Sequence, residues 1–125
     1  MELSVNELRI GNYVSHFGFE HKIEAIHSKN KLSDKHRHIV FENGVETYLL
    51  NLAPIKLTEE WLLKLGFKKI NGAFFKLSFL FYGIEVKDYL GFHFKKGEFT
   101  IELKYVHQLQ NLYFALTSEE LKINE

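Results

Sequence analysis

Histidines are the residues of this sequence whose type and spacing best suit chemistry. Five of the seven fall in the first 38 residues, at positions 16, 21, 27, 36 and 38. His36 and His38 are two residues apart, so on a strand both side chains point to one face and could bind the same metal ion. A zinc site would need one or two further ligands, for which the candidates are His21, His27 and Asp34. A solvated strand edge beside a lysine-rich loop is the reading we favour, because no spacing here matches a known metal site.

Other catalytic patterns are absent from the sequence. The serines lie in no nucleophile elbow of the Gly-x-Ser-x-Gly type, and no Gly-x-x-x-x-Gly-Lys phosphate loop is present. The chain has no cysteine, which excludes disulfides and thiolate metal sites and fits a reducing cytosol. We therefore expect no cofactor and favour a non-enzymatic protein. A small metal-dependent enzyme that uses the N-terminal histidines stays open as an alternative.

Two stretches combine basic and aromatic residues in a way that could bind nucleic acid. Residues 66–69 (GFKK) and 92–96 (FHFKK) could form a stacking platform with phosphate contacts. The candidate residues are Lys68, Lys69, Lys95 and Lys96. Strand alternation turns both phenylalanines of the second stretch inward, so a solvated hairpin end is the reading we favour. The chain has 16 basic and 16 acidic residues, which argues against a strongly electrostatic nucleic-acid binder.

The last predicted helix is the most unusual feature, because the sequence carries no formal charge between Lys104 and Glu119. Surface helices normally carry charges on their outer face. The face opposite the apolar stripe would present polar and aromatic residues that form a candidate interface: His107, Gln108, Gln110, Asn111 and Phe114. Either a partner or a second copy covers this face, or the helix is buried on both sides within the monomer.

Turn signals divide the chain into short strands. Asn43-Gly44, Asn71-Gly72 and Lys96-Gly97 each lie between strand-like runs and predict three hairpins, with type I′ turns that need positive φ at both central residues. A further turn is expected near Gly18. Four or five strands in residues 1–53 predict a small curled sheet or SH3-like barrel, in which Ile39 and Phe41 share the buried face.

The second part of the chain should combine two helices with a sheet. Thr58 is a good N-cap for a helix that ends at Gly66, followed by strands over residues 67–70, 73–77 and 79–87. Leu90, Phe92 and Phe94 are expected on one face of the next strand. Phe99, Ile101, Leu103 and Tyr105 alternate with polar residues and should line the buried face of the last strand. A final helix is predicted from about Val106 to Leu116, and residues 119–125 should fray or form a short strand.

The fold class is therefore α+β. We predict one domain with two lobes, a β-rich lobe over residues 1–53 and an α+β lobe over residues 54–125, joined at the only proline, Pro54. The order of the second lobe is a helix, an antiparallel sheet of hairpins and a C-terminal helix.

Three stretches of the sequence are distinctive: residues 7–14 (ELRIGNYV), 57–67 (LTEEWLLKLGF) and 105–117 (YVHQLQNLYFALT). Together they resemble a family of small uncharacterised proteins from Bacteroidetes genomes and their phages and prophages. The resemblance runs along nearly the whole chain, and it implies a bacterial, cytoplasmic protein linked to a mobile element. It implies no activity and no catalytic residues. Ser118 stands where that family usually has glycine, which leaves the end of the last helix open.

These observations favour a phage- or prophage-associated accessory protein that acts through protein–protein contacts, with a protein partner or through self-association. A nucleic-acid-associated accessory protein is the alternative. We expect a cytoplasmic location and no membrane association. The N-terminus is neither basic nor followed by an apolar run, and apolar stretches are far shorter than the roughly 20 residues of a membrane span.

Overall fold

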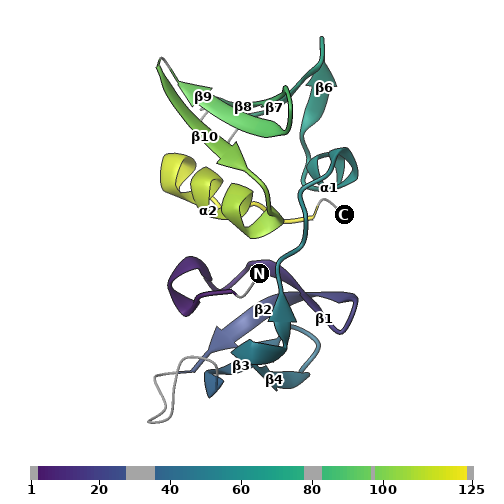
Figure 1. The fold of residues 1–125 in the computed structure, drawn as a ribbon, viewed down its shortest axis with the longest axis vertical. Helices are drawn as coiled ribbons and strands as arrows, with labels where there is room; N and C mark the ends of the chain where they lie inside the picture. The colour runs from purple at the N-terminus through teal and green to yellow at the C-terminus, as the bar shows by residue number, and fades with distance from the viewer. Residues whose placement is uncertain (1–2, 28–35, 78–82, 97, 124–125) are drawn as a thin grey trace. The chain divides into compact units, whose positions relative to one another are not determined.

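The computed structural model describes residues 3–27, 36–77, 83–96 and 98–123 (Figure 1). The fold is α+β, with antiparallel sheets and, among these residues, two α-helices. The chain divides into two compact units, Met1–Ile55 and Lys56–Glu125, close to the predicted junction at Pro54. Each unit is described below by itself.

Unit 1 is a curled antiparallel sheet of five strands. A 3-10 turn, η1 (Val5–Glu7), precedes them, and a second, η3 (Leu49–Asn51), separates the last two. The strands are β1 (Tyr13–His16), β2 (Phe19–Ile26), β3 (His38–Phe41), β4 (Glu46–Tyr48) and β5 (Leu52–Ala53). Their order is β4-β3-β2-β1-β5, so that β5 returns beside β1. Ile39 and Phe41 are fully buried in the core, as the alternation along β3 predicts.

The turns of unit 1 agree only in part with the turns that the sequence predicts. At Phe17-Gly18, both residues have positive φ (51° and 86°) and connect the paired residues His16 and Phe19. The hairpin at Asn43-Gly44 is confirmed, but its predicted type I′ turn is wrong. Only Gly44 has positive φ there, and the N–H of Phe41 donates to the Val45 carbonyl at 2.9 Å. The loop thus has three residues, for which a single left-handed position at the end is the usual solution.

Unit 2 is built on a second five-stranded antiparallel sheet, ordered β10-β9-β8-β7-β6. Its strands are β6 (Lys68–Ile70), β7 (Ala73–Leu77), β8 (Gly83–Asp88), β9 (Phe92–Lys96) and β10 (Phe99–Leu103). Asn71 and Gly72 both have positive φ (51° and 81°), which fits the predicted type I′ turn. Lys96 pairs with Phe99, so the hairpin predicted at Lys96-Gly97 is confirmed. Residues 79–82 of the strand predicted over 79–87 lie outside the described residues.

Helix α1 (Glu59–Lys64) has the ends that the sequence predicts. The Thr58 hydroxyl accepts the N–H of Trp61 at 3.2 Å. At the other end Gly66 has φ 91°, its N–H donates to Leu63, and the N–H of Phe67 donates to Leu62. This pair of bonds is the Schellman motif, which satisfies carbonyls that the last turn leaves without helical partners.

Helix α2 (Val106–Thr117) ends one residue beyond its predicted end. Figure 1 shows it beside β10, and the two elements are in contact. Ser118 adopts the left-handed conformation (φ 62°), and its N–H donates to the Phe114 carbonyl at 2.8 Å. The end of the last helix, which the sequence left open, is therefore at Ser118.

Two of the predicted inward positions of unit 2 are wrong, and Tyr105, predicted at the end of the last strand, is instead the N-cap of α2. Leu90 is 91% exposed because β9 begins only at Phe92, which leaves Leu90 in the preceding turn with φ 52°. Phe99 lies on the same side of β10 as the buried Leu103, but at the outer end of the strand it is 64% exposed. Alternation assigns a side of the sheet, whereas burial also requires something that covers that side.

Two further observations complete the description. Leu121 is buried beyond the end of α2, and within the described residues no strand follows the helix. None of the helices in the described part of the chain has the length and apolar character that crossing a membrane requires.

Candidate functional site

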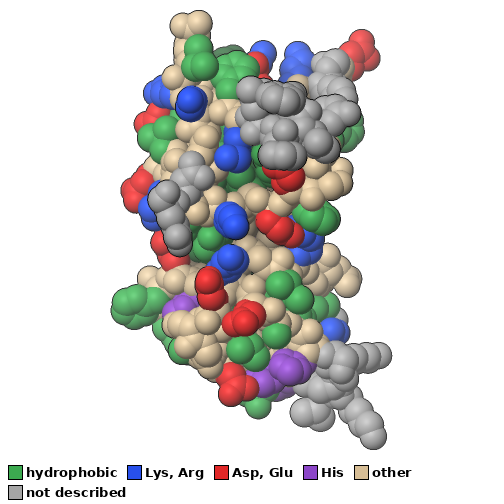
Figure 2. Space-filling view, turned by 180° about the vertical axis from the view of Figure 1, so that it is seen from behind, with side chains coloured by type: hydrophobic (Ala, Val, Ile, Leu, Met, Phe, Trp, Pro, Cys, Tyr) green, Lys and Arg blue, Asp and Glu red, His purple; other side chains and the backbone are tan. Residues whose placement is uncertain are grey.

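The structure separates the histidines of unit 1 into two groups. In Figure 2 the histidine side chains (purple) on the visible face likewise lie in separate places. The first group surrounds Tyr48 on β4. The rings of His36 and His38 each lie 6.2 Å from the Tyr48 ring, and His27 stacks on His38 with ring centres 4.6 Å apart. The Nε2 of His38 is 2.8 Å from the Glu46 carboxylate.

This geometry does not favour a metal site at the candidate ligands His36 and His38. His36 precedes β3 rather than lying on it, so the expected strand spacing between His36 and His38 is wrong. Stacked rings such as those of His27 and His38 hold their nitrogens in nearly parallel planes, which do not converge on one ion. His21 lies in the other group, and Asp34 is outside the described residues. Within the described ranges, no three His, Asp or Glu side chains are arranged to hold a metal ion.

The second histidine group lies where β1 and β2 meet the core. The ring of His21 stacks on the buried Phe41 at 4.5 Å, and the ring of His16 meets Phe41 edge-on at 5.4 Å. His16 Nε2 is also 3.1 Å from the hydroxyl of Thr47. These rings therefore extend the core of unit 1 toward the surface and serve packing.

The face of α2 predicted as an interface has several structural functions. His107 and Gln110 are fully buried, and Gln110 Nε2 donates to the carbonyl of Leu121 at 2.9 Å. The Oε1 of Gln108 accepts the N–H groups of Lys104 and Tyr105, which satisfies the start of the helix. Asn111 is half-buried and Phe114 is 37% exposed. The amides thus explain how a helix without charges can be accommodated, and a partner for this face stays a prediction.

The four lysines predicted as a nucleic-acid patch do not form one cluster. Lys69 lies 2.7 Å from Glu59 of α1, and this hydrogen bond and the nearby charge raise the pKa of Lys69. By register, Lys68 and Lys95 lie on the opposite side of the sheet, with β7 and β8 between them. Glu85 on β8 lies in that interval, because it pairs with Phe75, the partner of Lys68. The Lys96 side chain is outside what the structure describes.

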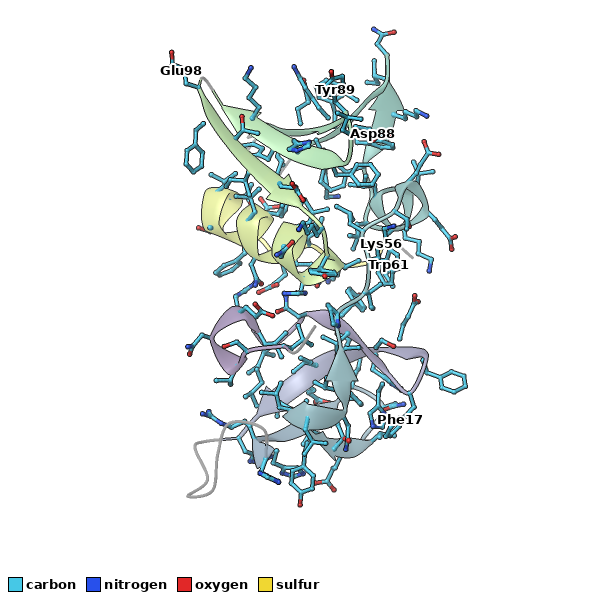
Figure 3. All side chains as sticks on the ribbon, viewed as in Figure 1. Phe17, Lys56, Trp61, Asp88, Tyr89 and Glu98 are labelled. Carbon is cyan, nitrogen blue, oxygen red and sulfur yellow. The ribbon has the colours of Figure 1, made fainter. Side chains whose placement is uncertain are left out.

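Sequence reasoning missed the most exposed aromatic residues of unit 1. Phe17 and Phe19, at the turn between β1 and β2, are 73% and 72% exposed. We call these two residues the aromatic tip; Figure 3 labels Phe17. The signal in the sequence was a phenylalanine directly before the turn glycine, where asparagine is the usual residue.

Within the aromatic tip, Phe17 contacts the second histidine group. The ring of Phe17 lies 4.4 Å from that of His16, which contacts Phe41 in turn. Phe17 is thus oriented by the sheet and yet open to solvent. No protein-family model, curated protein or solved structure matches this chain.

Proposed function

We propose that this chain is a non-enzymatic interaction module that binds another protein through the aromatic tip, Phe17 and Phe19. The observation that carries the proposal is the state of Phe17, which is both 73% exposed and in the left-handed backbone region (φ 51°). That backbone region costs a side chain such as phenylalanine about 1 kcal/mol or more. A costly backbone position supports a hypothesis of function, and here it carries one of two large aromatic rings that are exposed at the same turn, Phe17 and Phe19.

Charge favours a protein over a nucleic acid as the partner of this tip. The hairpin from Tyr13 to Ile26 carries one lysine, Lys22, and two glutamates, Glu20 and Glu24. Phosphate backbones are bound through clustered cations, which this hairpin lacks. An apolar or aromatic surface of a protein is the complement that two exposed phenylalanines fit.

The strand order of unit 1 supports an SH3-like identity for it. Five antiparallel strands run as a meander, with the short η3 turn before a last strand that pairs with the first. We propose that unit 1 is an SH3-like barrel that presents the aromatic tip. The resemblance to phage and prophage proteins supports a setting in the bacterial cytoplasm.

Photocrosslinking tests the proposed function. Phe17 is replaced by a phenylalanine that carries a benzophenone group, and the protein is irradiated in the cells that make it. Leu50, which is 53% exposed in the same unit, is the matched control position. We expect a discrete covalent adduct with a second protein from position 17 and none from position 50. Adducts with nucleic acid alone, adducts equal at both positions, or no adduct would overturn the proposal.

A substitution then measures what the tip contributes. Phe17→Asn removes the ring but keeps a residue that tolerates the left-handed region, so the fold should be unaffected. The partner protein identified by crosslinking is purified, and its affinity for the wild type and for Phe17→Asn is measured by titration. We expect Phe17→Asn to weaken binding by about 10-fold or more, as for a hot spot. Leu50→Ala should change the affinity by less than about 2-fold.

A further inference from the structure

We infer that β10 is a docking edge for a second copy of this chain, with the two β10 strands paired antiparallel. The inference concerns unit 2 and does not rest on the aromatic tip of unit 1. The two edge strands of the sheet of unit 2 are β6 and β10.

The two edges differ in how they are protected. β6 has three residues, two of which are lysines, and short lysine-bearing edges resist pairing with other strands. β10 has five residues, Phe-Thr-Ile-Glu-Leu, with Glu102 as its only charge and with Phe99 64% exposed. An edge of this length and composition is a template for another strand.

The register fixes which backbone groups face the open side of β10. Lys96 and Phe99 close a connection of two residues, so they exchange hydrogen bonds, and every second residue of β10 from Phe99 faces β9. Thr100 and Glu102 therefore direct their N–H and C=O groups to the open edge. Lys104, two residues beyond Glu102, also faces away from β9, and its carbonyl accepts the N–H of Leu57 at 2.8 Å. Among the residues that the structure describes, the edge that remains open is thus Phe99 to Leu103.

Charge selects one of the three registers that two such edges can adopt. Residues with outward groups must face each other, which permits Thr100–Thr100, Glu102–Glu102 or Thr100–Glu102 pairs. The first register places Glu98 of one copy opposite Glu102 of the other, and the second places the Glu102 carboxylates opposite each other. Like charges directly opposite destabilise a sheet. The mixed register has no like-charged opposition within the strands.

The mixed register is also self-complementary. Each Thr100 faces Glu102 of the other copy, Ile101 faces Ile101, and each Phe99 faces Leu103, so both copies use the same patch as a two-fold axis requires. Phe99, which the monomer leaves exposed, gains an apolar neighbour. Glu98, labelled at the hairpin end in Figure 3, comes level with Lys104 of the second copy, just beyond the paired residues. A contact confined to five residues belongs to the weak, transient class of interfaces.

Sedimentation velocity from about 10 µM to about 1 mM tests the inference, since weak association appears only at such concentrations. We expect the wild type to pass reversibly from monomer toward dimer. Thr100→Lys should lower the dissociation constant by about 3- to 10-fold, because it creates two opposite-charge pairs with Glu102 per dimer. Thr100→Glu should raise it by a similar factor. Thr100 is exposed, so both variants should fold.

The Thr100→Lys variant distinguishes this register from others. A lysine on an edge strand normally suppresses association, and in the Thr100–Thr100 register it would face another lysine. Weaker association of Thr100→Lys would therefore overturn the inference, as would a wild type that stays monomeric throughout.

Prolines provide a matched pair that tests backbone pairing directly. Thr100→Pro removes an N–H that faces the open edge of β10, and Lys69→Pro does the same on β6. We expect only Thr100→Pro to abolish the dimer. Equal effects of the two prolines would contradict pairing through β10. Phe17→Asn should leave sedimentation unchanged, so failure of this inference and failure of the proposed function give different results.

Discussion

The polar residues of α2 and the histidines of unit 1 stand in contrasting environments. On α2, Gln108 accepts a hydrogen bond from the N–H of Lys104, just before the helix. Gln110 donates one to the carbonyl of Leu121, beyond the end of the helix. In unit 1, His21 and His38 stack on neighbouring rings at the margin of the sheet. The amides therefore stabilise the fold by hydrogen bonds to the backbone, whereas the histidines combine ring stacking with polar side-chain contacts at positions that water can reach. Polarity in a sequence does not by itself distinguish these functions.

The largest expected effect comes from charging the buried amide. Gln110→Glu places a carboxylate where Nε2 donates to the Leu121 carbonyl, so two acceptors face each other inside the protein. We expect the free energy of unfolding to fall by about 3 kcal/mol or more at pH 7. Urea denaturation measures the change. Asn111→Asp, at a half-buried position on the same helix, should cost less; full stability of Gln110→Glu would show that the amide is not needed.

Replacing a histidine of unit 1 should lower the free energy of unfolding by less. His21→Ala removes the ring that stacks on Phe41 but opens no enclosed cavity, since His21 is only partly buried. We expect a loss of about 1 kcal/mol, the size of an aromatic pair. His21→Phe should restore most of it, because stacking rather than hydrogen bonding supplies the stability. A variant His21→Phe as unstable as His21→Ala would point instead to the polar contact with Asn43.

What the sequence could predict depends on the range of the interactions involved. The caps of α1 rest on contacts within five residues, so Thr58 and Gly66 could be identified from spacing alone. The type I′ turn at Asn71-Gly72 is local in the same sense. The loop at Asn43 differs, because Asn-Gly indicates a turn there but the register of β3 on β4 sets how many residues the turn contains.

The candidate sites were harder to predict because they depend on partners far apart in the chain. His27 meets His38 only through the register of β2 on β3, and no local spacing indicates that contact. Exposure of Phe17, Leu90 and Phe99 contradicts the general rule that such residues fill a core. That rule holds for most positions, and its exceptions at turns and edges became visible only with the sheet topology.

Replacing Ser118 tests the end of α2, because one substitution there should make the protein more stable. A serine in the left-handed region is less favourable than glycine, which adopts positive φ without steric cost. We expect Ser118→Gly to raise the free energy of unfolding by about 0.5–1 kcal/mol, and Ser118→Val to lower it. Thermal unfolding followed by circular dichroism measures both. A glycine variant less stable than the wild type would mean that the serine side chain itself supports the helix end.

The last expected effect is a loss of stability that occurs only at alkaline pH. It concerns Tyr113, which is buried on α2. Burial, and secondarily the charge of Glu119, raises the pKa of the Tyr113 hydroxyl. Because the folded pKa lies above the unfolded value near 10, the contribution of this group is fully present below about pH 10 and is lost as pH rises through the folded pKa. We expect the wild type to lose stability in that window more steeply than Tyr113→Phe, which has no proton to release. Tyr89→Phe is the matched control, since it removes the same hydroxyl from a side chain that is 75% exposed. Identical alkaline slopes for the wild type and Tyr113→Phe would show that the Tyr113 hydroxyl ionises equally well in the folded and the unfolded chain, so that its burial on α2 does not oppose the charge.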